Sequence, residues 1–159
     1  MASLNGRRSS TLGRILAVCR SDNKGTVKEP VPEGVIKVNF GMAGDAHAET
    51  GIKRQVSLMT IESIKRMQKE GYNVVPGSFA ENLTTEDIDL LSMPIGTRFA
   101  VGNSVLLEVT QIGKECHTGC AIFKQVGKCI MPKEGVFTKV LRGGVVSAGD
   151  EIKVSRDEV

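Results

Sequence analysis

Short apolar segments separated by polar turns recur along most of this chain. The continuous apolar run within Arg14–Cys19 predicts a buried strand, and the nearly alternating segment Val35–Phe40 predicts a second one. Turn-forming residues follow the first segment at Ser21–Gly25 and precede the second at Pro32–Gly34. The second half of Lys53–Met59 returns to strand-like character. The first third of the chain therefore predicts short strands joined by turns.

One segment has the periodicity of a helix. Thr60 is typical of a helix N-cap, and Ile61, Ile64 and Met67 follow it at helical spacing. Gly71 is typical of the residue after a helix end. The pattern predicts a short amphipathic helix whose charged residues form a solvated face.

The rest of the chain continues the strand pattern. Asp87–Leu91 suggests a brief extended element, and Arg98–Val101 and Val105–Thr110 predict a hairpin turned by Gly102 and Asn103, which both tolerate positive φ. Short strands at about ten-residue spacing with one or two helices favour a mainly β fold over a βαβ sheet. We therefore expect a closed or partly open β-barrel. Three further strands are predicted at Val136–Leu141, Val145–Val146 and Glu151–Val154.

Composition places the chain among ordinary globular domains. Its 159 residues, 40% hydrophobic and 25% charged, suit one domain with one core. Residues 1–12 are polar and aperiodic and predict a flexible arm or an added leader, which leaves 13–159 as a single domain. The sequence shows no secretion signal and no apolar stretch of membrane-spanning length, so we expect a cytoplasmic protein with no membrane partner.

Charge is distributed unevenly. The formal net charge is only +3, but the segment Gln111–Val145 has six basic residues against two acidic ones. Such an excess forms either a solvated surface or a site for anionic groups. Nucleic acid is not expected as a partner, because the segment lacks interleaved aromatic residues and any known nucleic-acid-binding signature. The basic residues are Lys114, Lys124, Lys128, Lys133, Lys139 and Arg142.

Four cysteines are present, and three of them lie within fourteen residues, from Cys116 to Cys129. We expect them to be reduced, because a domain of this size needs no disulfides. Cys19 lies in an apolar run and is typical of a buried structural cysteine, an interpretation that also suits Cys120. Zinc is an alternative, with His47 or His117 completing a thiolate site, but the spacing shows no second ligand pair.

The third interpretation is a reactive thiolate at Cys116. Lys114 and His117 would favour the ionised sulfur, and glycines at 113 and 119 leave its approach open. Glu115 would act in the opposite direction. Thiolate is both the attacking species and the metal ligand, so this position is the strongest candidate for chemistry.

Three loop positions have polar side chains suited to a site. His47 stands between Asp45 and Glu49, so it is either oriented by a carboxylate for acid–base work or a plain loop residue. Arg54 suits phosphate or carboxylate recognition, although arginines also pair with surface acids. Glu81–Asn82 either holds a ligand or satisfies backbone amides at a turn.

An ordered series of motifs resembles the MOSC domain family, named for the C-terminal domain of molybdenum cofactor sulfurases. The likeness covers roughly Gly13 to Val154 and is similar to the free-standing bacterial members. The chain has no room for the pyridoxal-phosphate desulfurase domain of the large sulfurases. The motifs are Gly44–Ala48, Arg54–Leu58, Phe79–Thr84, Ile95–Arg98, Leu107–Gln111 and Cys116.

This resemblance implies a β-barrel that binds molybdenum cofactor or a related molybdopterin. Cys116 matches the family's signature cysteine, which is proposed to take sulfur as a persulfide or, in amidoxime-reducing relatives, to ligate molybdenum. His47, Arg54 and Asn82 would line the same cleft. From the basic excess of the segment Gln111–Val145 we infer that Lys114 and Arg142 would bind the phosphate of the pterin.

The function expected from this resemblance is that of a sulfur carrier or transferase in cofactor maturation. Its partners would be cofactor-biosynthetic proteins and a cysteine desulfurase. A molybdenum-dependent reductase of N-hydroxylated compounds with a separate redox partner is an alternative, as is a non-catalytic cofactor carrier. The chain departs from many relatives at Glu115, where they have proline. Cys120 and Cys129 are additional thiols suited to resolving a persulfide.

Overall fold

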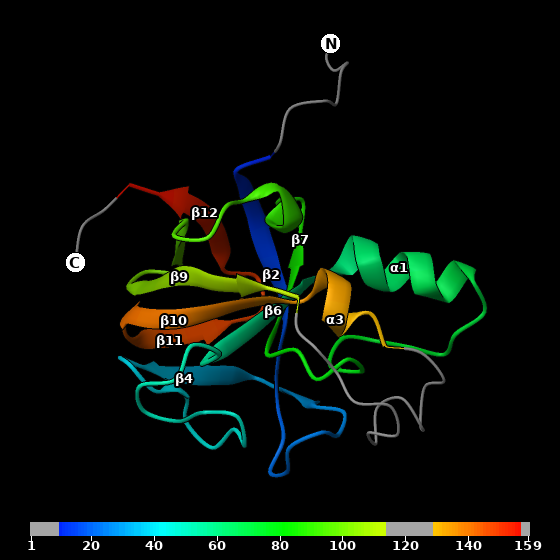
Figure 1. Cartoon of the computed structure of the whole chain (residues 1–159), viewed down its shortest axis with the longest axis horizontal. Coiled ribbons are helices and arrows are strands. Elements are labelled where there is room, and N and C mark those ends of the chain that lie inside the picture. The colour runs from blue at the N-terminus through cyan, green and yellow to red at the C-terminus, as the bar shows by residue number, and fades with distance from the viewer. Residues whose placement is uncertain (1–9, 114–128, 157–159) are drawn as a thin grey trace.

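The computed structural model describes residues 10–113 and 129–156 (Figure 1). Lys114, Cys116, His117 and Cys120 lie outside the described residues, so the predictions made for them stay predictions. Within the described part of the chain, no helix is long and apolar enough to span a membrane.

Seven strands form a closed barrel. Their order is β12-β8-β9-β10-β6-β7-β2, and the start of β2 pairs again with β12 to close the sheet. The short β3 (Glu29–Val31) pairs with the end of β2, on the edge that faces away from β7. The closed β-barrel predicted from the sequence is thus confirmed. The barrel strands are β2 (Leu12–Arg20), β6 (Val56–Thr60), β7 (Leu83–Glu86), β8 (Arg98–Val101), β9 (Val105–Ile112), β10 (Val136–Arg142) and β12 (Glu151–Ser155).

One pair of barrel strands is parallel. Strands β6 and β7 run in the same direction and are joined by α1 (Ile61–Lys69), a crossover that a parallel pair requires. The helix begins as predicted, because the Ser63 amide donates to Oγ1 of the N-cap Thr60 at 3.1 Å. Its apolar residues Ile61, Ile64 and Met67 are buried. The barrel therefore contains a single βαβ unit.

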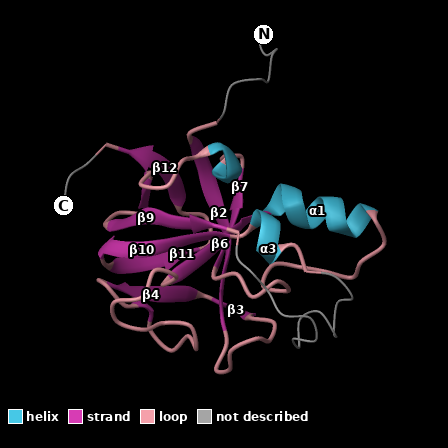
Figure 2. Cartoon of the chain, viewed as in Figure 1, coloured by secondary structure: helices cyan, strands magenta, loops and turns pink. Residues whose placement is uncertain are grey.

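A smaller antiparallel sheet lies beside the barrel (Figure 2). It consists of β11 (Gly144–Ser147), β4 (Glu33–Lys37) and β5 (Gly41–Met42). The strand predicted over Val35–Phe40 starts earlier and ends at Lys37. Asn39 has a φ of 53°, which is incompatible with an extended strand.

The extended element predicted over 87–91 was wrong. Asp87 has a φ of 72°, and the chain then forms a short 3-10 helix, η1 (Leu90–Ser92). The strand in this region is β7, whose threonines at 84 and 85 are fully buried and so conceal it from a hydrophobic pattern. At the other end of the domain, Leu12 opens β2, and the Thr11 carbonyl accepts a hydrogen bond from the Val154 amide at 2.9 Å.

Two apolar cores form the interior. The larger one fills the barrel, and the smaller one lies between the barrel wall and the helices α1 and α3 (Met131–Glu134), which lie next to each other in Figure 1. Glu134 joins the helices because it accepts a hydrogen bond from Ser63 Oγ at 2.6 Å and forms an ion pair with Arg66. The smaller core includes Phe79, Met131 and Phe137, which also line the pocket described next.

Candidate functional site

A pocket of about 270 Å³ opens at the edge of the smaller core. Its lining contains apolar, polar and cationic side chains. The apolar ones are Ile52, Phe79, Ala80, Met131 and Phe137, and the polar and charged ones are Lys24, His47, Arg54, Ser57 and Asn82. The structure therefore brings together His47, Arg54 and Asn82 from three separate sequence motifs.

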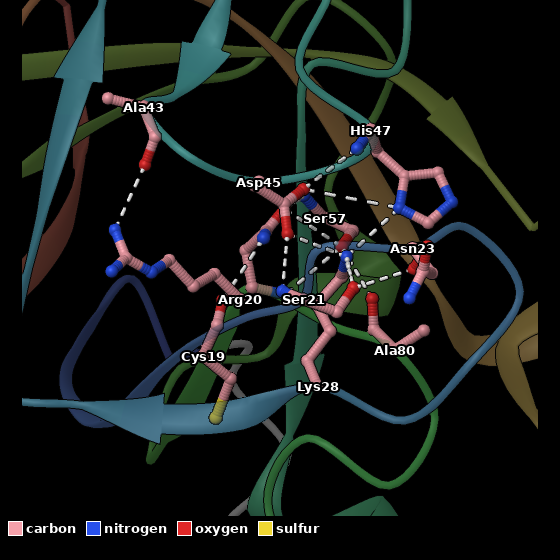
Figure 3. Close-up of polar contacts among 11 residues, drawn as sticks. Cys19, Arg20, Ser21, Asn23, Lys28, Ala43, Asp45, His47, Ser57 and Ala80 are labelled. Carbon is pink, nitrogen blue, oxygen red and sulfur yellow. Dashed lines mark hydrogen bonds and ion pairs between the residues drawn. The ribbon is translucent and has the colours of Figure 1, made fainter.

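A buried ion pair supports the loop that contains His47 (Figure 3). Lys28 Nζ lies 2.7 Å from Asp45 Oδ1, and neither side chain is exposed to solvent. The Ser21 amide donates to Asp45 Oδ1 and the His47 amide donates to Asp45 Oδ2, both at 3.1 Å. Asp45 thus fixes the backbone of the His47 loop against the end of β2.

Lys28 also contacts the imidazole ring. Its Nζ lies 2.9 Å from His47 Nδ1, whereas Asp45 Oδ2 is 4.0 Å from that nitrogen. Burial by itself would raise the pKa of Asp45, but the hydrogen bond and charge of Lys28, with the Ser21 amide, lower it. One prediction was that a carboxylate orients the His47 ring. In the structure the ring nitrogen Nδ1 contacts Lys28, and Lys28 in turn contacts the Asp45 carboxylate.

Asn82 forms part of the pocket wall through hydrogen bonds that hold the fold. Its Oδ1 accepts from the Ser57 amide at 3.0 Å and from Ser57 Oγ at 3.3 Å, while its Nδ2 donates to the Cys19 carbonyl at 3.2 Å. The side chain is 1% exposed. Asn82 therefore ties β6 to β2 directly beneath the pocket.

Glu81 satisfies backbone amides, which is one of the two roles predicted for Glu81–Asn82. Its carboxylate accepts from the Gly77 amide at 2.8 Å and the Phe79 amide at 3.2 Å, and from Thr84 Oγ1 at 2.9 Å. Complete burial raises the pKa of this carboxyl, against the effect of these hydrogen bonds. The carboxylate shapes the loop that presents Phe79 and Ala80 to the pocket.

The lysine and the arginine of the pocket lining are exposed to solvent. Arg54 is exposed, and its guanidinium lies 5.7 Å from the centre of the Phe137 ring, which is a cation–π distance. Lys24 is also exposed on the loop after β2. Two long cationic side chains near aromatic lining residues suit an anionic ligand with a flat apolar part.

Arg142 is separate from this pocket. It lies at the C-terminal end of β10, five residues from Phe137, or roughly 17 Å at strand rise. It does not belong to the pocket lining, so the described structure does not bring it together with His47, Arg54 and Asn82.

The two described cysteines differ in their surroundings. Cys19 is fully buried, and burial with the nearby Glu81 and Glu29 charges raises its pKa to about 12. This geometry fits the structural role predicted for it. Cys129 is half-buried and packs against the smaller core next to Met131. Residues 10–113 and 129–156 contain no group of three histidine, cysteine or acidic side chains arranged to hold a metal ion.

Sequence reasoning missed Lys24 and Lys28. Both lie in a polar stretch between two strands, where a lysine normally belongs to a solvated turn, and nothing local indicates that one of them is buried. The apolar lining residues could be found in part from the sequence. Phe79 belongs to a motif of the family resemblance, and Phe137 belongs to a predicted strand.

These features define a closed β-barrel with an anion-compatible pocket at its side. The profile of the MOSC domain family matches residues 37–153, most of the chain, and the protein belongs to this family. Among curated proteins, no sequence matches it.

Solved structures share the fold. The YuaD protein from Bacillus subtilis superposes with a TM-score of 0.73 at 20% identity, covering 92% of this chain and 97% of that one. YiiM from Escherichia coli gives 0.65 at 20% identity, covering 91% and 71%. YiiM from Geobacillus stearothermophilus gives 0.62 at 17% identity, covering 91% and 73%. The family match and these shared folds confirm the prediction of a MOSC domain.

Proposed function

We propose that this protein binds molybdenum cofactor in the pocket lined by His47 and Arg54 and passes sulfur to it through Cys116. The observation that supports this best is a pocket lined by both aromatic and cationic side chains in a chain of the MOSC family, a family generally associated with molybdenum cofactor. The cofactor has a flat pterin and an anionic phosphate, and these two kinds of side chain suit its two parts.

The residues of the pocket suit the two parts of such a ligand. Arg54 and Lys24 supply charged donors for phosphate, and Arg54 also offers the planar fork that suits it. Phe79, Phe137 and Met131 supply an apolar surface for a planar ring. We assign Asn82 to holding Ser57 and β2 in place, because its amide already serves those groups.

The proposed reactive cysteine belongs to the segment that follows β9. The described chain stops at Gly113, whose amide donates to the Gly135 carbonyl at 2.7 Å, and resumes at Cys129. Both ends therefore adjoin α3, and Met131 of α3 is part of the pocket wall. The described residues on both sides of this segment thus lie near the pocket, which supports the choice of Cys116 from the family resemblance as the residue that delivers sulfur, with Lys114 proposed to favour its thiolate.

The sulfur step needs a persulfide donor such as a cysteine desulfurase. The Cys116 thiolate attacks the outer sulfur of the donor persulfide, a new S–S bond forms on Cys116, and the donor leaves as a thiolate. This loading step conserves electrons. Release of the outer sulfur at the sulfide level then requires a second thiol, for which Cys120 and Cys129 are candidates: its sulfur attacks Cys116 Sγ, a disulfide forms between the two cysteines, and hydrosulfide leaves. When bound, the cofactor would be the acceptor of this sulfide.

Cofactor binding is tested with isolated molybdopterin. The protein is incubated with the cofactor, passed through gel filtration, and assayed for retained pterin fluorescence. Arg54→Gln is expected to bind about 10- to 100-fold more weakly, as for loss of one charge-assisted hydrogen bond. Arg142→Gln is the matched control, because it removes the same group outside the pocket. Equal retention by both variants would contradict the assignment.

Sulfur transfer is tested by mass spectrometry. Incubation with a cysteine desulfurase and free cysteine is expected to add the mass of one sulfur to the peptide that contains Cys116. Cys116→Ser should abolish the addition, and Cys129→Ser should retain it. Addition of sulfur to Cys129 alone would show that Cys116 is not the sulfur carrier. Cofactor retention without any sulfur addition would favour a non-catalytic carrier.

A further inference from the structure

Lys28 Nζ contacts three polar atoms, as many as the donors of an ammonium group. Its Nζ lies 2.7 Å from Asp45 Oδ1, 3.2 Å from Ser21 Oγ and 2.9 Å from His47 Nδ1. The Ser21 hydroxyl donates its own proton to the Asn23 carbonyl at 2.9 Å, so its oxygen accepts from Lys28. An ammonium group has three donors and no acceptor. His47 Nδ1 must therefore offer its lone pair.

The Lys28 side chain lies against an anionic group. Both Lys28 and Asp45 are completely buried, and the ionised carboxylate is stabilised by the ammonium and by the amides of Ser21 and His47. A proton on His47 Nδ1 would point at an ammonium 2.9 Å away, which electrostatic repulsion disfavours. The remaining charged groups of the pocket, Lys24 and Arg54, are also cations.

We propose that Lys28 is a positioning residue that holds His47 as a neutral ring protonated on Nε2. Figure 3 shows the second ring nitrogen on the side away from Lys28. The ring thus offers the pocket a hydrogen-bond donor and not a base. Together with Lys24 and Arg54, this donor selects a ligand that has anionic oxygens. The identity of that ligand rests on the proposed function, whereas the state of the ring does not.

The ring is examined first in the full-length, ligand-free protein. Long-range ¹H–¹⁵N correlation spectra distinguish the two neutral tautomers and the imidazolium. The chain has only two histidines, so in the His117→Gln variant His47 has the only imidazole ring. The expected result at neutral pH is one tautomer, with a proton-free Nδ1 and a protonated Nε2. A population of Nδ1–H or of imidazolium would overturn the proposal.

The role of Lys28 is tested by removing it. Because Lys28→Met leaves Asp45 as a buried carboxylate without its cation, the double variant Lys28→Met/Asp45→Asn is measured in parallel. Both neutral tautomers are expected in the variants. Lys24→Met is the control for this spectrum, since it removes a pocket charge that does not contact Nδ1. A double variant that is folded and retains the single tautomer would refute the role of Lys28.

Ligand class is tested with inorganic phosphate followed through the His47 Nε2 resonance. The wild-type resonance is expected to shift with saturation, and the double variant is expected to bind about fivefold more weakly, as for one hydrogen bond. Absence of a phosphate-dependent shift in the wild type would contradict the oxyanion preference. A single tautomer in a protein that fails to retain molybdopterin would refute the proposed function and leave the Lys28 assignment standing.

Discussion

Replacing Asn82 with alanine is expected to destabilise the fold as well as the pocket. The change leaves the buried Ser57 amide and the Cys19 carbonyl without the partners that Asn82 supplies at 3.0 and 3.2 Å. An unsatisfied buried polar group costs about 1–3 kcal/mol, so two of them predict a loss of roughly 2–6 kcal/mol in the free energy of unfolding. That is a large fraction of the stability of a typical domain.

Urea denaturation followed by far-UV circular dichroism measures this loss. The midpoint should fall while the slope stays constant, which separates a change of stability from a change of the unfolded state. Asn103→Ala, in the exposed turn between β8 and β9, is the matched control and should change stability by less than about 0.5 kcal/mol. If Asn82→Ala behaved like this control, the hydrogen bonds assigned to Asn82 would not hold β6 to β2.

Three further predictions concern buried residues close to Lys28 and Asn82. Gly77→Ala should destabilise the protein by more than about 2 kcal/mol in urea denaturation, because its Cβ would lie 2.2 Å from the Lys28 carbonyl oxygen. Gly51→Ala has a similar positive φ but open space, and an equal loss there would show that backbone conformation alone is responsible. The Lys28 contact lowers the pKa of Asp45, although burial opposes it, so its stabilising effect is present above about pH 4 and is lost as pH falls through the lower folded-state pKa. Unfolding free energy should therefore fall more steeply below pH 4 in the wild type than in Asp45→Asn, and parallel curves would contradict this. Burial raises the pKa of Cys19 to about 12, so iodoacetamide at pH 8 should leave it unlabelled in the folded protein and label it after unfolding, as peptide mass mapping would show. Labelling at the same rate in both states would contradict its burial.

The barrel was predictable where strands alternate or contain apolar runs. Strands β2, β8, β9 and β10 follow that rule, and Thr60 identified the start of α1 correctly. Strand β7 was not predicted because two of its four residues are buried threonines, a polar residue type that a hydrophobic pattern does not count as buried. The two-residue β5 is too short for any periodicity to indicate it.

The pocket was predictable in part. His47, Arg54 and Asn82 lie in one pocket, as the family resemblance implied. The burial of Lys28 could not be predicted from the sequence. It depends on Asp45, seventeen residues away, and on a loop that returns to the end of β2. The position of Arg142 was equally unpredictable, since a basic excess in sequence does not tell which end of a strand a residue occupies.

Molybdenum and pterin content of the purified protein tests cofactor binding most directly. Wild type, Arg54→Gln and Cys116→Ser are purified from a host that makes the cofactor and are analysed for molybdenum, tungsten and zinc beside pterin fluorescence. We predict molybdenum and pterin together in the wild type and less of both in Arg54→Gln, with Cys116→Ser showing whether the thiolate also holds the metal. Wild-type protein without pterin, or equal pterin in wild type and Arg54→Gln, would contradict the assignment of this pocket to the cofactor.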